Sequence, residues 1–240
     1  SPNCTCPVIA APTSGGDEMV CEGLANPVLT ATPPVTPVGV TVDWYAAASG
    51  GTALLLNSNT YTSTETTPGT YTYYAESRET SSGCVSATRT AITFTIKDKP
   101  TGGITVAETS GTTPNDGTIC LGSSATLTGT GGDTYAWEDM STTNPRTVTP
   151  VSAGTTTYTV TITDAMGCKD TVEQSIITNP LPTAGITSSE TSGTTNNDNT
   201  ICTGASVNLT ATGGGTYVWE DNSTNADRTV SPVSTTTYTV

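Results

Sequence analysis

The sequence predicts an all-β fold of tandem β-sandwich modules, and three observations support this prediction. The composition favours strands joined by turns, because threonine and valine are abundant and the chain has 24 glycines and 15 prolines. No stretch has the apolar spacing of i, i+3, i+4 and i+7 that an amphipathic helix requires. A long segment also recurs within the chain, which is typical of tandem modules.

The recurring segment divides the chain into modules. Residues 103–139 and 185–221 are nearly identical, and each copy contains one cysteine and one tryptophan. A more divergent copy precedes them and contains Cys21 and Trp44. We therefore predict the end of a preceding module or a linker at 1–6, followed by modules at 7–98, 99–179 and 180–240.

The joints between these modules are the segments 97–103 and 178–185, and both contain proline. Proline disfavours both a helix and a flexible coil, so we expect short, semi-rigid linkers. Modules connected in this way predict an extended rod.

Alternating residues mark the strands of the second module. The first strand begins at Gly103, and a turn is expected at 164–167. The residues expected to face inward are, in chain order, Ala125, Leu127, Tyr135, Trp137, Tyr158, Val160, Ile162, Val172 and Ile176. Short strands at this spacing, together with a Cys…Trp…Cys pattern, predict an immunoglobulin-like sandwich.

The third module is predicted to be incomplete. Its last residues, Tyr238 and Val240, correspond to Tyr158 and Val160, so counterparts of Thr161–Ile177 would follow. We expect the polypeptide to continue through them, and the alternative is that another chain donates the missing strand. The opening residues, which include no initiator methionine or signal peptide, likewise predict a fragment or a processed form.

The charge excludes two classes of partner. A formal net charge of −14 and a sequence pI near 4.1 repel phosphate backbones and anionic lipids. The sequence also contains no run of 18 apolar residues. We expect neither a nucleic acid partner nor membrane insertion.

The chain contains seven cysteines and no histidine, which favours disulfides over zinc sites and predicts an oxidising, extracellular compartment. Equivalent positions in the modules predict the pairs Cys21–Cys84 and Cys120–Cys168. The remaining cysteines are expected to be unpaired or to have partners outside this chain, and they are Cys4, Cys6 and Cys202.

Catalysis is not expected. Without histidine, a Ser–His or Cys–His nucleophile cannot form within the chain. Glu138–Asp139 and Glu220–Asp221 are paired acids, but neighbours on a strand point to opposite faces and cannot flank one glycosidic bond. We therefore predict a protein that is not an enzyme and expect these acids to be solvated.

No cofactor is expected except calcium, which is a candidate ligand. Acidic and amide side chains occur in corresponding loops and near a cysteine, and oxygen ligands at a module joint would suit this ion. The candidate ligands are Asn115, Asp116, Asp164 and Asp198. The alternative is that these residues act only in turns, because asparagine and aspartate are common turn residues.

Segments of two modules resemble a known family. "VDWYAAASGG", "GTYTYYAES" and "GCVSATRTAIT" in the first module resemble immunoglobulin-like modules of very large surface proteins of Bacteroidota. "ICTGASVNLTATGGGTYVWEDNST" in the third is similar to the companion repeat of those proteins. The resemblance implies a part of an exported giant protein, such as the SprB-type gliding-motility adhesins that use the type IX secretion route. The "DTV" of residues 170–172 also resembles the O-glycosylation acceptor of these bacteria, which would make Thr171 a glycan site.

From these observations we predict a non-catalytic structural segment of a long extracellular adhesin filament attached to the cell surface. Its expected partners are adjacent modules of the same polypeptide, whereas a surface polysaccharide or a solid substratum would be bound by parts outside this chain. One alternative is a carbohydrate-binding or spacer region of a secreted polysaccharide-degrading enzyme. Another is a subunit of a pilus-like fibre that is completed by strand donation.

Overall fold

The structure, a computed structural model, describes residues 5–240. All regular elements in this range are β-strands, which confirms the predicted all-β class. The described residues include no helix long and apolar enough to cross a bilayer. By its internal contacts the chain falls into two compact units, formed by residues up to 107, 126–148 and 157–175, and by residues 108–125, 149–156 and 176–240. This division cuts through the second predicted module, and the predicted module boundaries stay a prediction.

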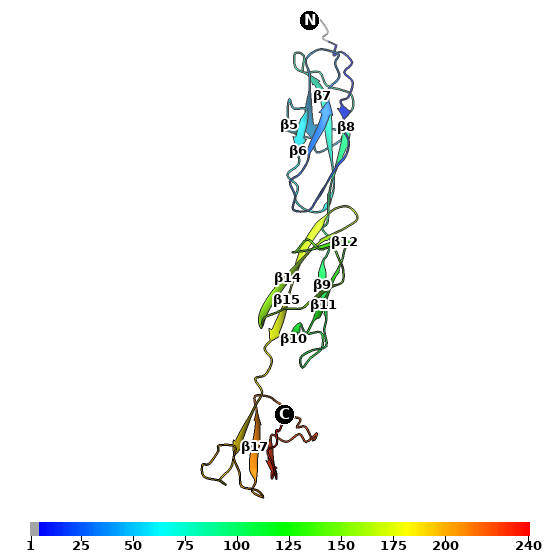
Figure 1. The fold of residues 1–240 in the computed structure, drawn as a ribbon. Coiled ribbons are helices and arrows are strands. Elements are labelled where there is room, and N and C mark those ends of the chain that lie inside the picture. The colour runs from blue at the N-terminus through cyan, green and yellow to red at the C-terminus, as the bar shows by residue number, and fades with distance from the viewer. Residues whose placement is uncertain (1–4) are drawn as a thin grey trace. The chain divides into compact units, whose positions relative to one another are not determined.

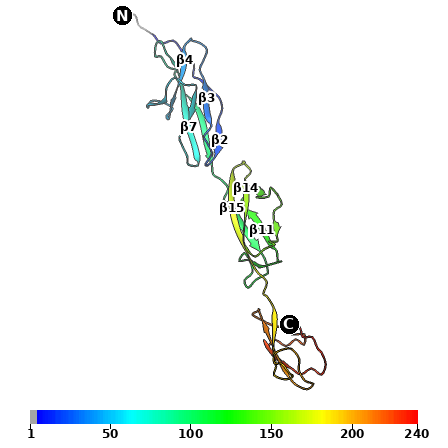
Figure 2. The same cartoon turned by 60° about the vertical axis from the view of Figure 1, so that its left-hand side comes forward.

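The first module is a sandwich of two sheets. The smaller sheet has the order β1 (Thr13–Ser14), β3 (Val28–Thr32) and β6 (Thr60–Thr62). The larger sheet has the order β2 (Glu18–Cys21), β8 (Thr90–Lys97), β7 (Gly69–Glu79), β4 (Val40–Tyr45) and β5 (Ala53–Leu55). Its pairs are antiparallel except for that of β2, which lies parallel to β8 at the sheet edge. Figure 2 labels β2, β7 and β4 of this sheet.

The core of the first module lies between these two sheets. Strands β7 and β8 bury every second side chain, as a half-buried strand should. Trp44 is fully buried, and its indole nitrogen donates a hydrogen bond to the Ser58 carbonyl at 2.9 Å. The other buried residues of this core are Leu29, Ala31, Val42, Tyr73, Ala75, Ile92, Phe94 and Ile96.

The second module also contains two sheets. One has the order β13 (Arg146–Val148), β11 (Ala125–Thr130) and β9 (Gly103–Ala107). The other has the order β10 (Thr118–Cys120), β15 (Lys169–Asn179), β14 (Gly154–Thr163) and β12 (Thr134–Trp137) (Figure 1). Most of the residues expected to face inward are buried, and these are Ala125, Leu127, Trp137, Tyr158, Val160, Ile162 and Ile176. Tyr135 and Val172 are half-buried.

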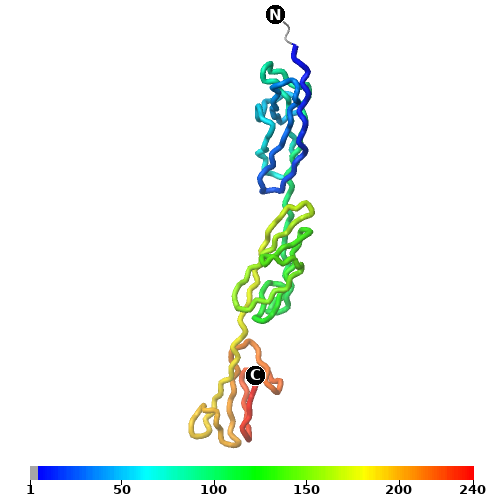
Figure 3. Tube along the Cα trace, turned by 45° about the horizontal axis from the view of Figure 1, so that its top comes forward, coloured from blue at the N-terminus to red at the C-terminus, as the bar shows by residue number. Residues whose placement is uncertain are grey.

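In the third module the described residues form one sheet, with the order β16 (Gly185–Ser189), β17 (Val207–Thr212) and β18 (Asp227–Val230). Figure 3 traces this part of the chain from yellow to red. Trp219 is buried against β17, and Tyr238 packs on the same cluster. The indole nitrogen of Trp219 donates a hydrogen bond to the Asn225 carbonyl at 2.8 Å. The indole nitrogen of Trp137 donates one to the Thr143 carbonyl at 3.0 Å. The three tryptophans are therefore core residues, as their matched positions predict.

Candidate functional site: the disulfide junctions

A disulfide connects the first sequence module to the second. Cys21 is the last residue of β2, and Cys168 follows the turn between β14 and β15. Their sulfur atoms are 2.01 Å apart and their Cα atoms 5.4 Å apart, which is ordinary disulfide geometry. Both cysteines belong to the same compact unit.

The turn that carries Cys168 is fixed by one carboxylate. Asp164 Oδ1 accepts hydrogen bonds from the amides of Met166 at 2.9 Å and Cys168 at 2.8 Å. The Asp164 amide in turn donates to the Cys168 carbonyl at 3.0 Å. An aspartate that binds backbone amides two and four residues later is acting as a turn cap. This candidate calcium ligand therefore orients the cysteine.

The linker after β8 contacts the hairpin of β14 and β15. The Gly102 amide donates to Asp170 Oδ2 at 3.3 Å, and Lys99 Nζ lies 4.0 Å from Asp170 Oδ1. A Cβ atom on Gly102 would lie 2.5 Å from Ile162 Cδ1, so the linker backbone approaches the hairpin closely. The junction thus combines a covalent bond with direct packing of the linker.

The predicted pairs Cys21–Cys84 and Cys120–Cys168 are wrong. Because β2 is parallel to β8, Cys21 pairs in register with Lys97 at the end of β8, whereas Cys84 precedes the start of β8. A strand of that length spans more than 20 Å at about 3.3 Å per residue, far beyond the reach of a disulfide. The second module repeats this arrangement, because Cys120 pairs in register with Asn179 at the end of β15 and Cys168 precedes its start.

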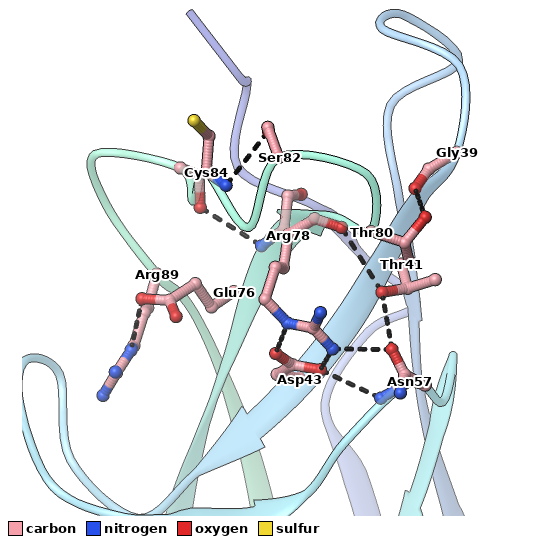
Figure 4. Close-up of polar contacts among 12 residues, drawn as sticks. Gly39, Thr41, Asp43, Asn57, Glu76, Arg78, Thr80, Ser82, Cys84 and Arg89 are labelled. Carbon is pink, nitrogen blue, oxygen red and sulfur yellow. Dashed lines mark hydrogen bonds and ion pairs between the residues drawn. The ribbon is translucent and has the colours of Figure 1, made fainter. Parts of the chain in front are cut away.

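The partner of Cys84 is Cys6, so the prediction that Cys6 is unpaired or bonded outside the chain is also wrong. Their Cα atoms are 5.6 Å apart. The Cys84 amide donates to Ser82 Oγ at 3.2 Å, and the Cys84 carbonyl accepts from the Glu79 amide at 2.9 Å (Figure 4). Among residues 5–240, Cys120 and Cys202 have free thiols, and Cys4 lies outside the described residues.

A buried ion pair lies near the hairpin turn of Cys84 (Figure 4). Asp43 is only 1% exposed, and its carboxylate accepts from Arg78 Nε at 2.5 Å and from Arg78 Nη2 at 3.1 Å. The backbone amide of Asn57 donates to the same carboxylate at 2.9 Å. The hydrogen bond to Asp43 raises the pKa of Arg78 above its ordinary value. The hydrogen bonds and the opposite charges are satisfied within this cluster, so we assign it a structural role in the first module.

The paired acids do not point to opposite faces as predicted. Arg146 contacts Glu138 at 2.7 Å and Asp139 at 3.0 Å, because β12 ends at Trp137 and the next residues form a turn. The third module repeats the arrangement, with Arg228 at 2.6 Å from Glu220 and 3.0 Å from Asp221. Each pair is therefore held by an arginine.

The loops with the other candidate calcium ligands are closed by their own backbone. In the second module, Asn115 Oδ1 accepts from the Glu108 amide at 3.1 Å, and Asp116 Oδ1 accepts from the Thr118 amide at 2.7 Å. Asp198 accepts from the Thr200 amide at 2.8 Å in the third module. Within the described range, no three or more His, Cys, Asp or Glu side chains are grouped to hold a metal ion. Calcium binding stays a prediction.

These loops contain a residue that the sequence did not single out. Glu108 is buried, and its Oε1 accepts from the Asp116 amide at 3.0 Å. Its equivalent Glu190 is also buried and accepts from the Asp198 amide at 2.9 Å. Thr171, the candidate glycan site, is exposed on β15, and the structure does not test its modification.

Comparison with known protein families finds a match that covers the first module. The family model described as "Ig-like domain CHU_C associated" matches residues 9–97, which include both of its sheets. No curated protein matches the chain.

Several solved structures are similar to parts of this chain at low identity. Drosophila N-cadherin EC1-4 is 11% identical over 71% of this chain, with a TM-score of 0.31, and this chain spans 50% of its length. The fibronectin(III)-like modules of Clostridium thermocellum CbhA are 14% identical over 70% of this chain and 94% of theirs, with a TM-score of 0.32. The Bacteroides ovatus SGBP-B, solved with a mixed-linkage heptasaccharide, is 11% identical over 92% of this chain and 70% of its own, with a TM-score of 0.26.

The strands, sheets and family match define tandem immunoglobulin-like β-sandwich modules. The Ig-like family match supports the role of a structural repeat or spacer module rather than that of an enzyme.

Proposed function

We propose that this chain is a structural segment of a long extracellular adhesin filament of the Bacteroidota surface-protein type. Its modules would hold a binding region away from the cell and transmit force to the surface, and gliding motility is one process that would use such a filament. The observation that carries this proposal is the Cys21–Cys168 bond, which joins two successive modules covalently outside their linker. Disulfides also favour an oxidising compartment outside the cytoplasm.

The bond changes how tension passes through the chain. Cys21 and Cys168 are 147 residues apart in sequence, so the bond provides a short covalent path around that segment. When the chain is pulled from its ends, the Cys21–Cys168 bond carries the tension. The segment between the two cysteines is therefore not stretched. At roughly 3.4 Å per residue, the shielded contour is about 500 Å.

Single-molecule force spectroscopy tests this role. The chain would be pulled between handles at its two ends, first oxidised and then in reductant. We expect the long extension of about 500 Å to appear only after reduction or in a Cys6→Ser/Cys21→Ser double variant, because Cys21→Ser alone leaves the Cys6–Cys84 bond. Equal extension of the oxidised and reduced chains would contradict a force-bearing junction.

The carbohydrate-binding alternative lacks an obvious stacking platform. Sugar recognition commonly uses aromatic faces, but all three tryptophans are buried. In the described part of the chain every tyrosine and phenylalanine is buried or half-buried. A glycan array with the intact chain would decide, because specific binding would favour this alternative.

The fibre-subunit alternative has one observation in its favour. A cavity of about 520 Å³ in the third module is lined by both polar and apolar residues, and the apolar ones include Ile201, Val207, Leu209 and Tyr238. Ile201 corresponds to Ile119 of β10, which pairs with β15 in the second module. A strand like β15 could therefore fill the cavity, from the same polypeptide or from another. Binding of a peptide with the sequence of Lys169–Asn179, measured by calorimetry, would support donation in trans, and no binding would oppose it.

A further inference from the structure

We propose that Cys120 is a second junction cysteine, which forms a disulfide with the hairpin-turn cysteine of the module that follows it. The partner is the residue that a complete module of this type has at the position of Cys168. Successive modules would then be joined by one disulfide at every joint. This inference deepens the proposed function and rests on it for the tandem array.

The first line of support is that Cys120 and Cys21 have the same surroundings. Cys21 ends β2, which lies parallel to β8, and the amide after it, that of Glu22, donates to the Lys97 carbonyl at 2.8 Å. Cys120 ends β10, which lies parallel to β15, and the amide after it, that of Leu121, donates to the Asn179 carbonyl at 2.8 Å.

The turns after the two cysteines also match. The Leu24 amide donates to the Cys21 carbonyl at 3.2 Å, and the Ser123 amide donates to the Cys120 carbonyl at 2.9 Å. Both cysteines thus end the edge strand of a module beside the start of the next linker. Cys21 is bonded there to Cys168, whereas the thiol of Cys120 is free and half-exposed.

The second line of support comes from the hairpin cysteines. The Glu79 amide donates to the Cys84 carbonyl at 2.9 Å, and the Asp164 amide donates to the Cys168 carbonyl at 3.0 Å, so each cysteine carbonyl closes its hairpin turn, although the turn of Cys84 is one residue longer. Neither cysteine is bonded to the strand-end cysteine of its own module. Cys84 is bonded to Cys6 and Cys168 to Cys21, so each partner comes from a more N-terminal part of the chain.

The third line of support is that both linkers approach the following module in the same way. A Cβ atom on Gly131 would lie 2.1 Å from the Thr101 carbonyl oxygen, which belongs to the first linker. A Cβ atom on the equivalent Gly213 would lie 1.8 Å from the Thr183 carbonyl oxygen of the second linker. A third module whose linker packs in this way would bring its hairpin turn to the region of Cys120, as the second module does for Cys21.

The bond forms by ordinary thiol oxidation. The two thiols lose two protons and two electrons and gain one S–S bond, while a disulfide oxidant such as oxidised glutathione takes up the electrons and becomes two thiols. By the same pattern, Cys202 would be bonded to the module after the third.

The first experiment uses the chain as it is. A Cys4→Ser variant removes the one cysteine outside the described residues, and the oxidised protein is alkylated, digested and mapped without reduction. We expect linked peptides for Cys6–Cys84 and Cys21–Cys168, with Cys120 and Cys202 alkylated. A Cys120–Cys168 peptide would overturn the proposal, because it would show bonding within a module.

The second experiment supplies the partner. A copy of residues 161–179 is appended after Val240 in the same Cys4→Ser background, so that the third module gains a hairpin turn with a cysteine. After refolding with oxidised and reduced glutathione, we expect the appended cysteine to be linked to Cys120, and alkylation of Cys120 to fall from nearly complete to nearly absent. A link to Cys202 instead would overturn the proposal.

Two variants of the extended chain act as controls. With Cys202→Ser the link to Cys120 should form unchanged, and a free Cys120 in this folded variant would contradict the proposal. With Cys120→Ser the appended cysteine should become alkylated. Peptide mapping shows which cysteines are bonded, whereas the pulling experiment shows whether the Cys21–Cys168 bond carries tension. This inference can therefore fail while the proposed function holds.

Discussion

At the scale of single residues, Asp43 shows how the first module tolerates a buried charge. Its carboxylate has three donors, two from Arg78 and one from the Asn57 amide, so no charge is left unpaired. The pair is valuable mainly because breaking it leaves a buried charge without its counter-ion.

Arg78→Ala, which leaves the buried Asp43 carboxylate without its counter-ion, is therefore expected to lower the free energy of unfolding by about 3–5 kcal/mol. The matched control is Lys99→Ala, because Lys99 is half-exposed and lies 4.0 Å from its partner Asp170. That substitution should change stability by less than about 1 kcal/mol. Urea unfolding measures both, and similar small losses would contradict the structural role given to Asp43.

Two equivalent glutamates predict how stability depends on pH. The Thr239 amide and Arg228 lower the pKa of Glu220. Burial raises the pKa of Glu138, but the hydrogen bonds that it accepts, including those from Arg146 and the Thr159 amide, outweigh burial and lower it overall. Folded glutamates with a lowered pKa bind fewer protons than the unfolded chain does in the same pH range.

Their contribution to stability is therefore complete above the unfolded glutamate pKa of about 4.3, and it is lost as the pH falls through the lower folded pKa. We expect the urea midpoint to fall between about pH 5 and pH 3, and Glu138→Gln to make that fall smaller. A urea midpoint that rises on acidification would contradict the lowered pKa values of these two glutamates.

At the scale of elements, two glycines of the second module have similar backbone conformations but different neighbours. Gly131 has a φ of 94°, and a Cβ atom there would meet the Thr101 carbonyl oxygen of the linker. Gly122 has a similar φ of 90°, but no atom lies within 4 Å of its Cβ position. The two positions therefore share a left-handed backbone that would strain any residue with a Cβ atom, and they differ in the contact with the linker.

Gly122→Ala should cost about 1–2 kcal/mol, from the left-handed backbone alone. Gly131→Ala should cost at least about 1 kcal/mol more, because the linker must also move. Urea unfolding of the two variants gives the difference. Equal losses would mean that the linker is not held against the second module.

Strand alternation made most of the core predictable. Tyr158, Val160 and Ile162 face inward as their spacing predicts, because period-two burial is a local property of the sequence. The disulfides were not predictable in this way. Their pairing depends on β2 lying parallel to β8, and nothing in the local pattern around Cys21 specifies that long-range register. A turn at 164–167 was predicted, but the role of Asp164 in orienting Cys168 needs the folded geometry.

At the scale of the whole molecule, the extended rod is a prediction from the proline-containing linkers. Small-angle scattering of the oxidised chain tests it. We expect a maximum dimension of roughly 100 Å for three modules of about ten residues' strand length each. A compact globule would contradict the rod.

The two disulfide loops overlap in sequence, since one runs from Cys6 to Cys84 and the other from Cys21 to Cys168. A single peptide-bond cleavage anywhere between Cys6 and Cys168 therefore leaves both products joined by at least one disulfide. A specific protease site inserted at 35–38, where Val35 and Val38 are exposed, should give one band on a non-reducing gel and two bands after reduction. The same site inserted at 193–196, outside both loops, should give two bands in either condition. Separation of the first variant without reductant would contradict the overlap.

This overlap matters for a protein exposed to extracellular proteases. In most single-stranded tethers one cut releases everything beyond it, so the lifetime of the tether is set by its weakest loop. Here a cut in the exposed loops of the first module would leave the far end still attached to the near end. Three cuts, one between each successive pair of the four bonded cysteines, would be needed to separate the two ends, so the segment should survive damage that would sever an unbridged chain.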